Sequence, residues 1–352
     1  MTSRGRQHLR SESGPLAVTM GEPAGVGGEL TLKCWLRRES EHLSPFFAVD
    51  SPARLDSLRR GLGLEVPIRQ IESTAEVPHV FRDALPVMPI QISVDVTPGQ
   101  PDSSNSGAVV RSIDDAVATV RRKEAVAVVT NPIHKSTLSR AEFPYPGHTE
   151  YLGVLAEVSK PVMMLVSDEL RVVPVTGHMA LRDAIMALTP NAIVEAAKVS
   201  NDALVTHFGI DRPRLVVASL NPHAGENDLF GEEERTIIRP AIELLQADGL
   251  DVRGPLPADS LFHAGARTTY DAAICMYHDQ ALIPLKAIDF MGGVNVTLGL
   301  PFVRTSPDHG TALDIAGQGT ADETSMLNAL KLAARMARRV VTHEGLFLSA
   351  HG

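Results

Sequence analysis

The feature that most constrains the fold is a series of short apolar runs, each ending abruptly at a polar motif. Six runs rich in Val, Ile, Leu and Met have this form, at residues 16–20, 125–130, 161–167, 172–176, 215–220 and 272–277. Runs this short and this β-branched are typical of buried strands. Helical patterns lie between them, at residues 107–122, 191–208 and 232–247. The alternation predicts an α/β fold with a mostly parallel sheet.

Composition excludes several classes of protein. Lys and Arg number 33 against 42 Asp and Glu, and aromatic residues make up 4% of the chain. An acidic chain with few aromatics lacks both the basic surface and the stacking groups of a nucleic-acid binder. No uncharged stretch reaches the roughly 18 apolar residues of a membrane helix. We therefore expect neither nucleic acid nor membrane as a partner.

The cysteines and the chain ends complete the outline. Only Cys34 and Cys275 are present, too few for a disulfide framework, and Cys275 lies in an apolar run that predicts a core thiol. No signal-peptide pattern follows the polar N-terminus, so we expect a cytoplasmic protein. Residues 1–15 are expected to form a flexible tail, the Pro-rich residues 85–101 a loop or an irregular excursion, and residues 320–343 a packing helix.

Histidines follow several of the predicted strands. In parallel sheets ligands bind beyond the carboxyl ends of the strands, where polar loops meet. Four histidines are expected in such loops: His178, His223 and His278 follow strand-like runs, and His148 lies in a Pro/Gly loop. Neutral imidazole is a common metal ligand. The spacings of 45 residues from His178 to His223 and of 55 from His223 to His278, however, match no compact zinc motif. Hydrogen-bonded loop histidines are the alternative, and Asp279 and Glu226 could either orient the rings or lie on the surface.

Two glycine-rich segments could contact a ligand. Residues 21–29, GEPAGVGGE, could present backbone N–H groups to an anion or form a tight strand-to-helix turn. The segment matches neither GxGxxG nor the Walker A pattern. Residues 308–323 could wrap an adenosine ribose or form a plain loop.

Cationic side chains occur in an otherwise apolar stretch. Lys286, Asn295 and Arg304 stand nine residues apart. Charges in such a setting require an anionic partner, because an isolated charge is costly to desolvate. The partner is either a phosphate or carboxylate ligand, or an internal carboxylate such as Asp259 or Asp289.

Taken in order, the long motifs of the chain closely resemble the 4-hydroxythreonine-4-phosphate dehydrogenase family of vitamin B6 biosynthesis. The motifs are VTMGEPAGVG, TNPIHKSTL, YPGHTEYL, TGHMALRD, LNPHAGEND, GPLPADSLF, MYHDQALIPLK and GVNVTLGLPFVRTSPDHGTALDIAG. The resemblance implies a two-domain fold similar to the isocitrate and isopropylmalate dehydrogenases, with a mostly parallel sheet in each domain. It places residues 16–130 and 310–352 in one α/β domain and residues 131–309 in the other, with the active site in the cleft. It also implies a homodimer with shared active sites.

The resemblance further implies the site residues. It assigns a divalent metal, either zinc or magnesium, manganese or cobalt, to His178, His223 and His278, one of them contributed across the dimer. It assigns substrate contacts to His148, Thr149, Lys286, Asn295 and Arg304, with Asp259 in the same pocket. The proton acceptor stays open among Asp259, His148 and Lys286. NAD or NADP is expected on the adenosine-type loop, at Gly310, Thr311, Asp314 and Gly317.

The implied reaction oxidises an alcohol beta to a carboxylate, with decarboxylation, and converts 4-hydroxythreonine 4-phosphate to 3-amino-2-oxopropyl phosphate. Two departures from the family pattern, Asn131 and Gly28, leave the substrate open. The alternatives are 4-phospho-threonate or phospho-erythronate, and an aromatic cis-dihydrodiol carboxylate. Outside this reaction, the alternatives are an inactive sugar-phosphate-binding regulator and a metal-independent phosphate-binding hydrolase.

Overall fold

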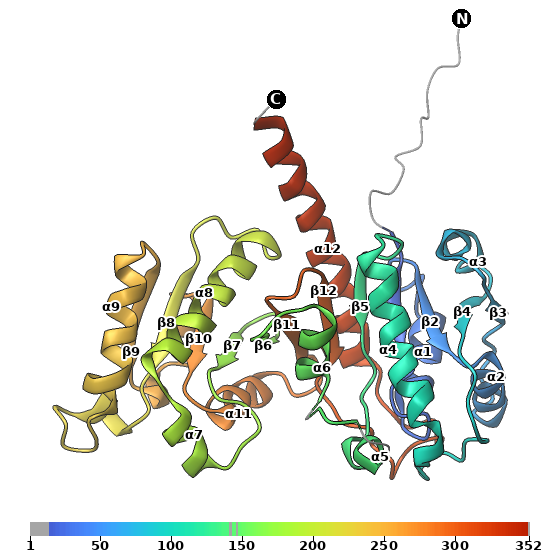
Figure 1. Ribbon diagram of the computed structural model, residues 1–352, viewed down its shortest axis with the longest axis horizontal. Helices are drawn as coiled ribbons and strands as arrows, with labels where there is room; N and C mark the ends of the chain where they lie inside the picture. Colours follow the sequence, from blue (N-terminus) through green and yellow to red (C-terminus); the bar gives the residue numbers. More distant parts are fainter. Residues whose placement is uncertain (1–13, 141–142, 146, 351–352) are drawn as a thin grey trace, which may run out of the picture.

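A single 12-stranded sheet forms the centre of the computed structural model, in the order β3-β4-β2-β1-β5-β12-β11-β6-β7-β10-β8-β9 (Figure 1). The structure describes residues 14–140, 143–145 and 147–350, with side chains up to residue 340, so most of the predicted tail lies outside the described residues. The strands are β1 (Leu16–Thr19), β2 (Phe46–Asp50), β3 (Ile68–Gln70), β4 (Leu85–Pro89), β5 (Ala127–Val129), β6 (Val162–Val166), β7 (Arg171–Pro174), β8 (Arg214–Ala218), β9 (Asp251–Leu256), β10 (Ala272–Cys275), β11 (Val294–Leu298) and β12 (Val303–Pro307). The predicted α/β class is confirmed.

Helices connect the strands and cover the sheet. They are α1 (Gly27–Leu36), α2 (Pro52–Gly61), α3 (Val77–Val80), α4 (Ser106–Arg121), α5 (Lys135–Arg140), α6 (His148–Leu155), α7 (Leu181–Ala187), α8 (Pro190–Thr206), α9 (Arg239–Ala247), α10 (Ala264–Arg267), α11 (His278–Ile288) and α12 (Thr324–Ala350). Short helical turns add η1 (Thr74–Glu76), η2 (Ser103–Asn105), η3 (Pro222–Gly225), η4 (Glu234–Ile238) and η5 (Ala258–Ser260). The six strands and three helices predicted from the apolar patterns all form, with ends shifted by a few residues.

Strand direction changes in the middle of the sheet. Strands β11 and β12 pair antiparallel, as do β11 with β6 and β6 with β7, whereas all other pairs are parallel. Strands β7, β10, β8 and β9 therefore run opposite to β1 and β5 along the ladder. Seven strand pairs separate β1 from β8, and a twist of about 20–25° per pair accumulates to roughly 150°.

The twist offsets this reversal, so the carboxyl ends of the two groups of strands face the same side of the molecule. In Figure 1, α5, which follows β5, and α7, which follows β7, both lie along the lower side. The polar motifs predicted to share one sheet edge thus reach a common side through the twist.

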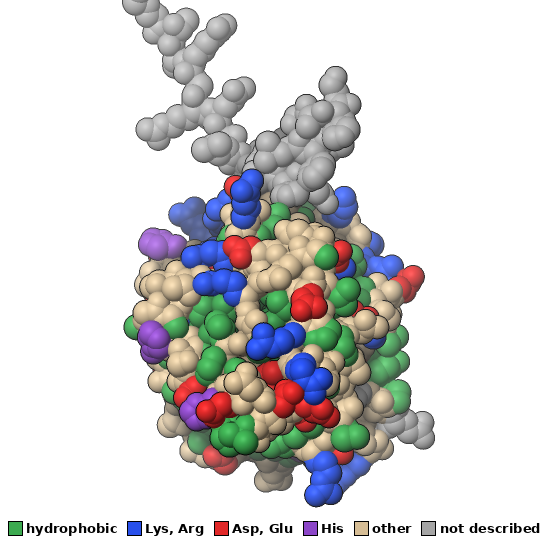
Figure 2. All heavy atoms as spheres, turned by 90° about the vertical axis from the view of Figure 1, so that its left-hand side faces the viewer, with side chains coloured by type: hydrophobic (Ala, Val, Ile, Leu, Met, Phe, Trp, Pro, Cys, Tyr) green, Lys and Arg blue, Asp and Glu red, His purple; other side chains and the backbone are tan. Residues whose placement is uncertain are grey.

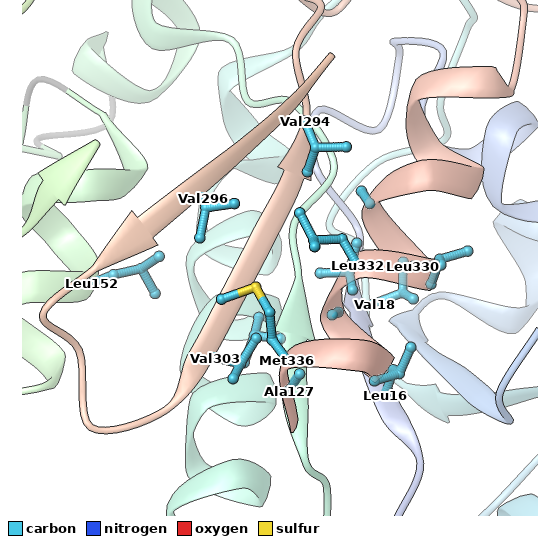
Figure 3. Packing of buried hydrophobic residues seen from close by; sticks show 14 of the residues in the cluster. Leu16, Val18, Ala127, Leu152, Val294, Val296, Val303, Leu330, Leu332 and Met336 are labelled. Carbon is cyan, nitrogen blue, oxygen red and sulfur yellow. The ribbon is translucent and has the colours of Figure 1, made fainter. Parts of the chain in front are cut away.

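The core is continuous across the middle strands. Figure 3 shows α12 packed on them, with Leu332 and Met336 of the helix beside Val296 and Val303 of the sheet. The predicted packing helix is confirmed: a helix spans Thr324–Ala350, and its side chains Met326 and Leu330 are buried in the core. Because this C-terminal helix packs on β12, β5 and β1, the end of the chain is held against its beginning. The boundary between the two predicted domains stays a prediction.

One segment differs from expectation. Residues 85–101 are not all loop, because Leu85–Pro89 form β4 between β3 and β2. The strand tolerates Pro86 and Pro89 because its hydrogen bonds toward β3 use other residues. The Leu85 N–H donates to the Pro67 carbonyl, and the Val87 carbonyl accepts from the Ile71 N–H. The ladder toward β3 thus uses non-proline groups. Both Cys34 and Cys275 are free and buried, as the absence of a disulfide framework predicts.

Candidate active site

A polar cavity of about 430 Å³ opens beyond the carboxyl ends of β5 and β12. Its walls come from β6, β11 and β12, from the loops after β5, β7 and β12, and from α5, α6 and α11. All five predicted substrate contacts line it: His148, Thr149, Lys286, Asn295 and Arg304. We call this space the substrate cavity. Residues far apart in the sequence converge here because β11 and β12 occupy the centre of the sheet.

Arg304 is the most buried cation of the substrate cavity. It lies on β12 with 3% of its surface exposed, and burial lowers its pKa to about 9. Its guanidinium donates to the Thr130 hydroxyl, at 2.6 Å from Nη2, and to the Thr297 hydroxyl, at 2.8 Å from Nη1. Within the described part of the chain no carboxylate forms an ion pair with it. An anionic ligand would therefore restore the favourable environment that burial removes.

Lys286 has an internal partner. Its ammonium lies 2.9 Å from Asp308 Oδ2 and also donates to the Asp308 carbonyl at 3.1 Å. The internal ion pair considered for this lysine therefore exists, but with Asp308 instead of Asp259 or Asp289. About a third of the Lys286 side chain stays exposed to the cavity, so its remaining donors can reach a ligand.

His148 and Asn295 present unpaired polar atoms. His148 is the first residue of α6, and its Nε2 is buried without a partner among the described residues, as is Asn295 Oδ1. Burial and the nearby Arg304 and Lys135 cations hold the pKa of His148 well below its ordinary value. The imidazole is therefore neutral at pH 7. Two buried unpaired atoms on one cavity wall indicate that polar ligand atoms belong there.

Of the three histidines predicted to bind metal, His178 and His278 are neighbours and His223 lies apart from them. The rings of His178 and His278 lie 5.0 Å apart between centroids, and His178 lines the substrate cavity. His278 Nδ1 lies 2.7 Å from Asp279 Oδ1, the orienting contact considered for that carboxylate. His223 is exposed and contacts Phe230, and no side-chain hydrogen bond to Glu226 is found in the described chain.

Among the described residues, no group of three or more His, Cys, Asp or Glu side chains is close enough to hold a metal ion. Asp259 is likewise separate. It lies exposed on η5 and does not line the substrate cavity of its own chain. One chain thus supplies a histidine pair, of which only His178 lines the substrate cavity, and leaves His223, His278 and Asp259 outside its lining.

A second cavity of about 430 Å³ adjoins the first and shares Lys286, Asp308 and His309 with it. Its walls are mostly apolar and include Ala312 and Ile315 of the loop predicted to hold adenosine. The residues predicted for the cofactor differ in position. Gly310 lines the substrate cavity, whereas Thr311, Asp314 and Gly317 line neither.

The structural reasons are local. The Thr311 carbonyl accepts from Val26 N–H at 3.0 Å, Asp314 is exposed, and Gly317 packs against Pro98. Sequence motifs identified the loop, but only the backbone path decides which side chains face the cavity.

The glycine-rich segment 21–29 forms the tight turn between β1 and α1. Its N–H groups are largely used inside the chain: Glu22 donates to Pro132, Gly25 to Glu22 and Val26 to Thr311. A Cβ at Gly25 would stand 2.9 Å from the Thr311 carbonyl oxygen. The structure therefore favours the strand-to-helix turn over the anion site.

Sequence reasoning missed two cavity residues, Lys135 and His309. Lys135 begins α5 and lines the substrate cavity. His309 lines both cavities; its Nδ1 lies 2.9 Å from the Gly310 carbonyl, and its Nε2 is buried and unpaired in the described structure. Both follow strand ends within the motifs TNPIHK and SPDHG, and that position is the signal that could have identified them.

The two departures from the family pattern lie beneath the site. Asn131 is 1% exposed and donates to the Thr19 carbonyl at 2.9 Å and the Thr31 hydroxyl at 3.0 Å. A Cβ at Gly28 would stand 2.8 Å from an Arg54 nitrogen. Neither residue lines the substrate cavity, so neither contacts a ligand bound there.

Comparisons with known proteins agree with this architecture. The family model described as pyridoxal phosphate biosynthetic protein PdxA matches residues 43–333. The 4-hydroxythreonine-4-phosphate dehydrogenase of Bradyrhizobium diazoefficiens is 52% identical over 92% of this chain and 97% of its own length. A 4-hydroxythreonine-4-phosphate dehydrogenase of Methylorubrum extorquens is 50% identical over 94% of this chain and 97% of its own length.

Solved structures give the same result. The crystal structure of the Klebsiella pneumoniae 4-hydroxythreonine-4-phosphate dehydrogenase matches with a TM-score of 0.83 and 36% identity, covering 92% of this chain and all of that one. A terephthalate 1,2-cis-dihydrodiol dehydrogenase from Burkholderia xenovorans, at 23% identity and a TM-score of 0.62, shares the fold.

Fold, cavities and relatives together define an α/β oxidoreductase. The chain belongs to the PdxA family of pyridoxal phosphate biosynthetic proteins. The alternative of an inactive binding protein is therefore set aside. The described helices include none with the length and hydropathy required to cross a membrane.

Proposed function

We propose that this enzyme oxidises 4-hydroxythreonine 4-phosphate with NAD or NADP and a divalent metal, and that decarboxylation gives 3-amino-2-oxopropyl phosphate. The observation that carries the proposal is Arg304, buried in a polar cavity with hydroxyl partners and no ion-paired carboxylate in the described chain. The curated relatives covering more than nine tenths of the chain bear the name of this activity.

The cavity suits a small substrate with two anionic ends. Arg304 can bind a phosphate or carboxylate through its remaining donors, and Lys286 and Lys135 add positive charge at the same walls. Neutral His148 and the Asn295 amide offer hydrogen bonds that fix orientation. These contacts would place the alcohol carbon in a defined position and limit its exposure to water.

His178 and His278 fit part of a metal site, because their rings face each other at 5.0 Å and Asp279 orients one of them. We infer that His223 of the partner subunit completes the set in a homodimer, since His223 is exposed here and away from the pair. When bound, a divalent ion would act as a Lewis acid on the alcohol oxygen and the carbonyl that replaces it. Imidazole ligands favour zinc or cobalt over magnesium.

The proton acceptor we favour is His148. It lines the cavity, its Nε2 has no partner in the described chain, and its lowered pKa keeps it neutral and able to accept a proton. Lys286 is ion-paired and Asp259 lies outside the cavity of its own chain. The apolar second cavity, which shares His309 with the first, is the space we propose for the dinucleotide.

A substrate panel tests the proposal. Reduction of NAD and of NADP is followed with 4-hydroxythreonine 4-phosphate, 4-phospho-threonate, phospho-erythronate and a terephthalate dihydrodiol. We expect the highest kcat/KM with the first compound, because a site that pairs a polar group strongly rejects analogues that lack it. A preference for 4-phospho-threonate would contradict the proposed substrate. Turnover of the dihydrodiol alone would contradict the proposal that the cavity binds a phosphorylated compound.

A further inference from the structure

A third cavity lies away from both cavities of the active site. It has a volume of about 370 Å³ and is lined by the β6–β7 turn, the end of α8 and the middle of α12. Four arginines line it: Arg171, Arg335, Arg338 and Arg339. Asp168 is the one carboxylate among its lining residues. We call this space the arginine cavity.

Such a concentration of positive charge is unusual for this chain, which carries a formal net charge of −9. On the face shown in Figure 2, by contrast, basic and acidic side chains are interspersed. Elsewhere in the described chain many arginines have carboxylate partners, for example Arg54 with Asp50 and Arg214 with Asp271, whereas Arg171, Arg335 and Arg339 form no ion pair with the described residues. The gathering of arginines around one hollow therefore suggests an anion as a further partner.

Arg171 stands at the base of the arginine cavity and has unused donors. Its Nη1 donates to the Asp271 carbonyl at 3.1 Å, and its guanidinium lies 5.0 Å from the Phe208 ring centre. Its Nε is buried and has no hydrogen-bond partner within the described residues, and the same holds for Nδ1 of the neighbouring His207. Buried donors without partners are rare unless a ligand or water completes them.

Arg335 and Arg339 stand one turn apart on α12 and are exposed. No hydrogen bond or ion pair joins either of them to the residues that the structure describes, and like charges at this spacing repel each other. Arg339 lies against the backbone of Gly209, where a Cβ would stand 3.1 Å from Cζ. The absence of a side chain there lets its guanidinium lie close to the end of α8.

We propose that the arginine cavity binds a tetrahedral dianionic oxyanion, either inorganic phosphate or the phosphate group of a small monoester. Arginine forks bind phosphate in a bidentate manner. The apolar wall formed by Phe208, Leu332 and Met336 would contact the carbon portion of a monoester. The proposed anion site does not depend on which substrate the enzyme oxidises.

The arginine cavity is connected to the active site by two neighbouring strands. In β6, Val166 lines the arginine cavity and Met163 lines the substrate cavity. In β7, Arg171 begins the strand whose carboxyl end leads to His178. The two sites thus lie at opposite ends of the same short strands.

The test is calorimetric titration of the full-length enzyme with inorganic phosphate and with glycerol phosphate, at fixed ionic strength. The variant Arg335→Gln/Arg339→Gln removes two exposed cavity charges. The matched control Arg59→Gln/Arg60→Gln removes two charges from α2, which lines none of the three cavities. The substrate cavity is intact in all three proteins, so its own phosphate binding is common to them.

We expect the cavity variant to lose one binding event, or to weaken it at least about tenfold, with kcat/KM for the substrate unchanged. Arg171→Lys, which keeps the charge and loses the fork, should weaken the same event less. Tighter binding of glycerol phosphate than of phosphate would identify a monoester as the occupant. Equal binding by the cavity variant and wild type, or equal weakening in the control, would overturn the proposal.

Discussion

The anion-binding part and the histidine part of the active site differ in how far one chain assembles them. All five predicted substrate contacts line one cavity, and Arg304, Lys286 and Asn295 are held there by the central strands and α11. Of the three predicted metal ligands, two face each other and His223 stays apart. On the proposed assignments, one chain would assemble the substrate contacts by itself, whereas the metal set would require a further component.

Removing a metal ligand should have the largest effect. We expect His178→Ala to lose bound metal and to lower kcat about 10⁴-fold or more, because the Lewis acid contributes several kcal/mol. His223→Ala should behave alike if it completes the set. The exposed His79→Ala is the matched control and should keep both. Elemental analysis of the purified proteins is the measurement, and stoichiometric metal in His223→Ala would contradict this assignment.

Changing Arg304 tests the other part. Arg304→Met should lower kcat/KM about 10³-fold, since two charge-assisted hydrogen bonds to a substrate anion are lost together. Metal content should be unchanged, which would separate the two parts of the site. Arg304→Lys should recover part of the loss, because it keeps the charge. Activity of Arg304→Met within tenfold of wild type would show that the anion binds elsewhere.

The neutral histidines predict a pH effect on stability. His148 has a folded-state pKa well below its ordinary value of 6.5, so the unfolded chain binds the proton more tightly. Stability of the ligand-free protein is therefore expected to fall as the pH drops below about 6.5. His207 and His309, whose pKa values are also lowered by burial, act in the same direction.

His148→Gln should reduce this pH dependence. The fall in melting temperature between pH 7 and pH 5 should be smaller than in wild type by about a degree or two. Thermal melts at several pH values measure the effect, with His79→Ala as control. An unchanged slope in His148→Gln would mean that folding does not lower the pKa of this imidazole.

The smallest effect is expected beneath the site. Asn131→Ala should change kcat/KM by no more than about twofold, because Asn131 bonds the Thr19 carbonyl of β1 and the Thr31 hydroxyl of α1 and does not line the cavity. Its stability should fall measurably in urea titrations, since the Thr19 carbonyl loses a donor. A change of preferred substrate would instead show that this position controls specificity.

The six apolar strands were predicted from the sequence pattern for a physical reason, whereas the five residues that line the substrate cavity were implied by the resemblance to the family. Strands such as 125–130 are apolar on both faces, and their motifs end where the loops begin. The sequence pattern did not predict β4 as a strand, because Pro86 and Pro89 disguise it. Nor could it place Thr311 or Asp314, whose orientation depends on the packing of the loop against the turn after β1. The Lys286 partner, Asp308, follows from the pairing of β11 with β12, which local patterns do not encode.

Substrate binding without metal tests most directly whether the anion cavity of a single chain recognises the substrate. Calorimetry of the chelator-treated wild-type protein with 4-hydroxythreonine 4-phosphate should give a Kd within about tenfold of the metal-loaded value. Metal-loaded Arg304→Met should bind far more weakly than either. If instead the metal-free protein fails to bind while Arg304→Met binds normally, the anion cavity of the single chain is not what recognises the substrate.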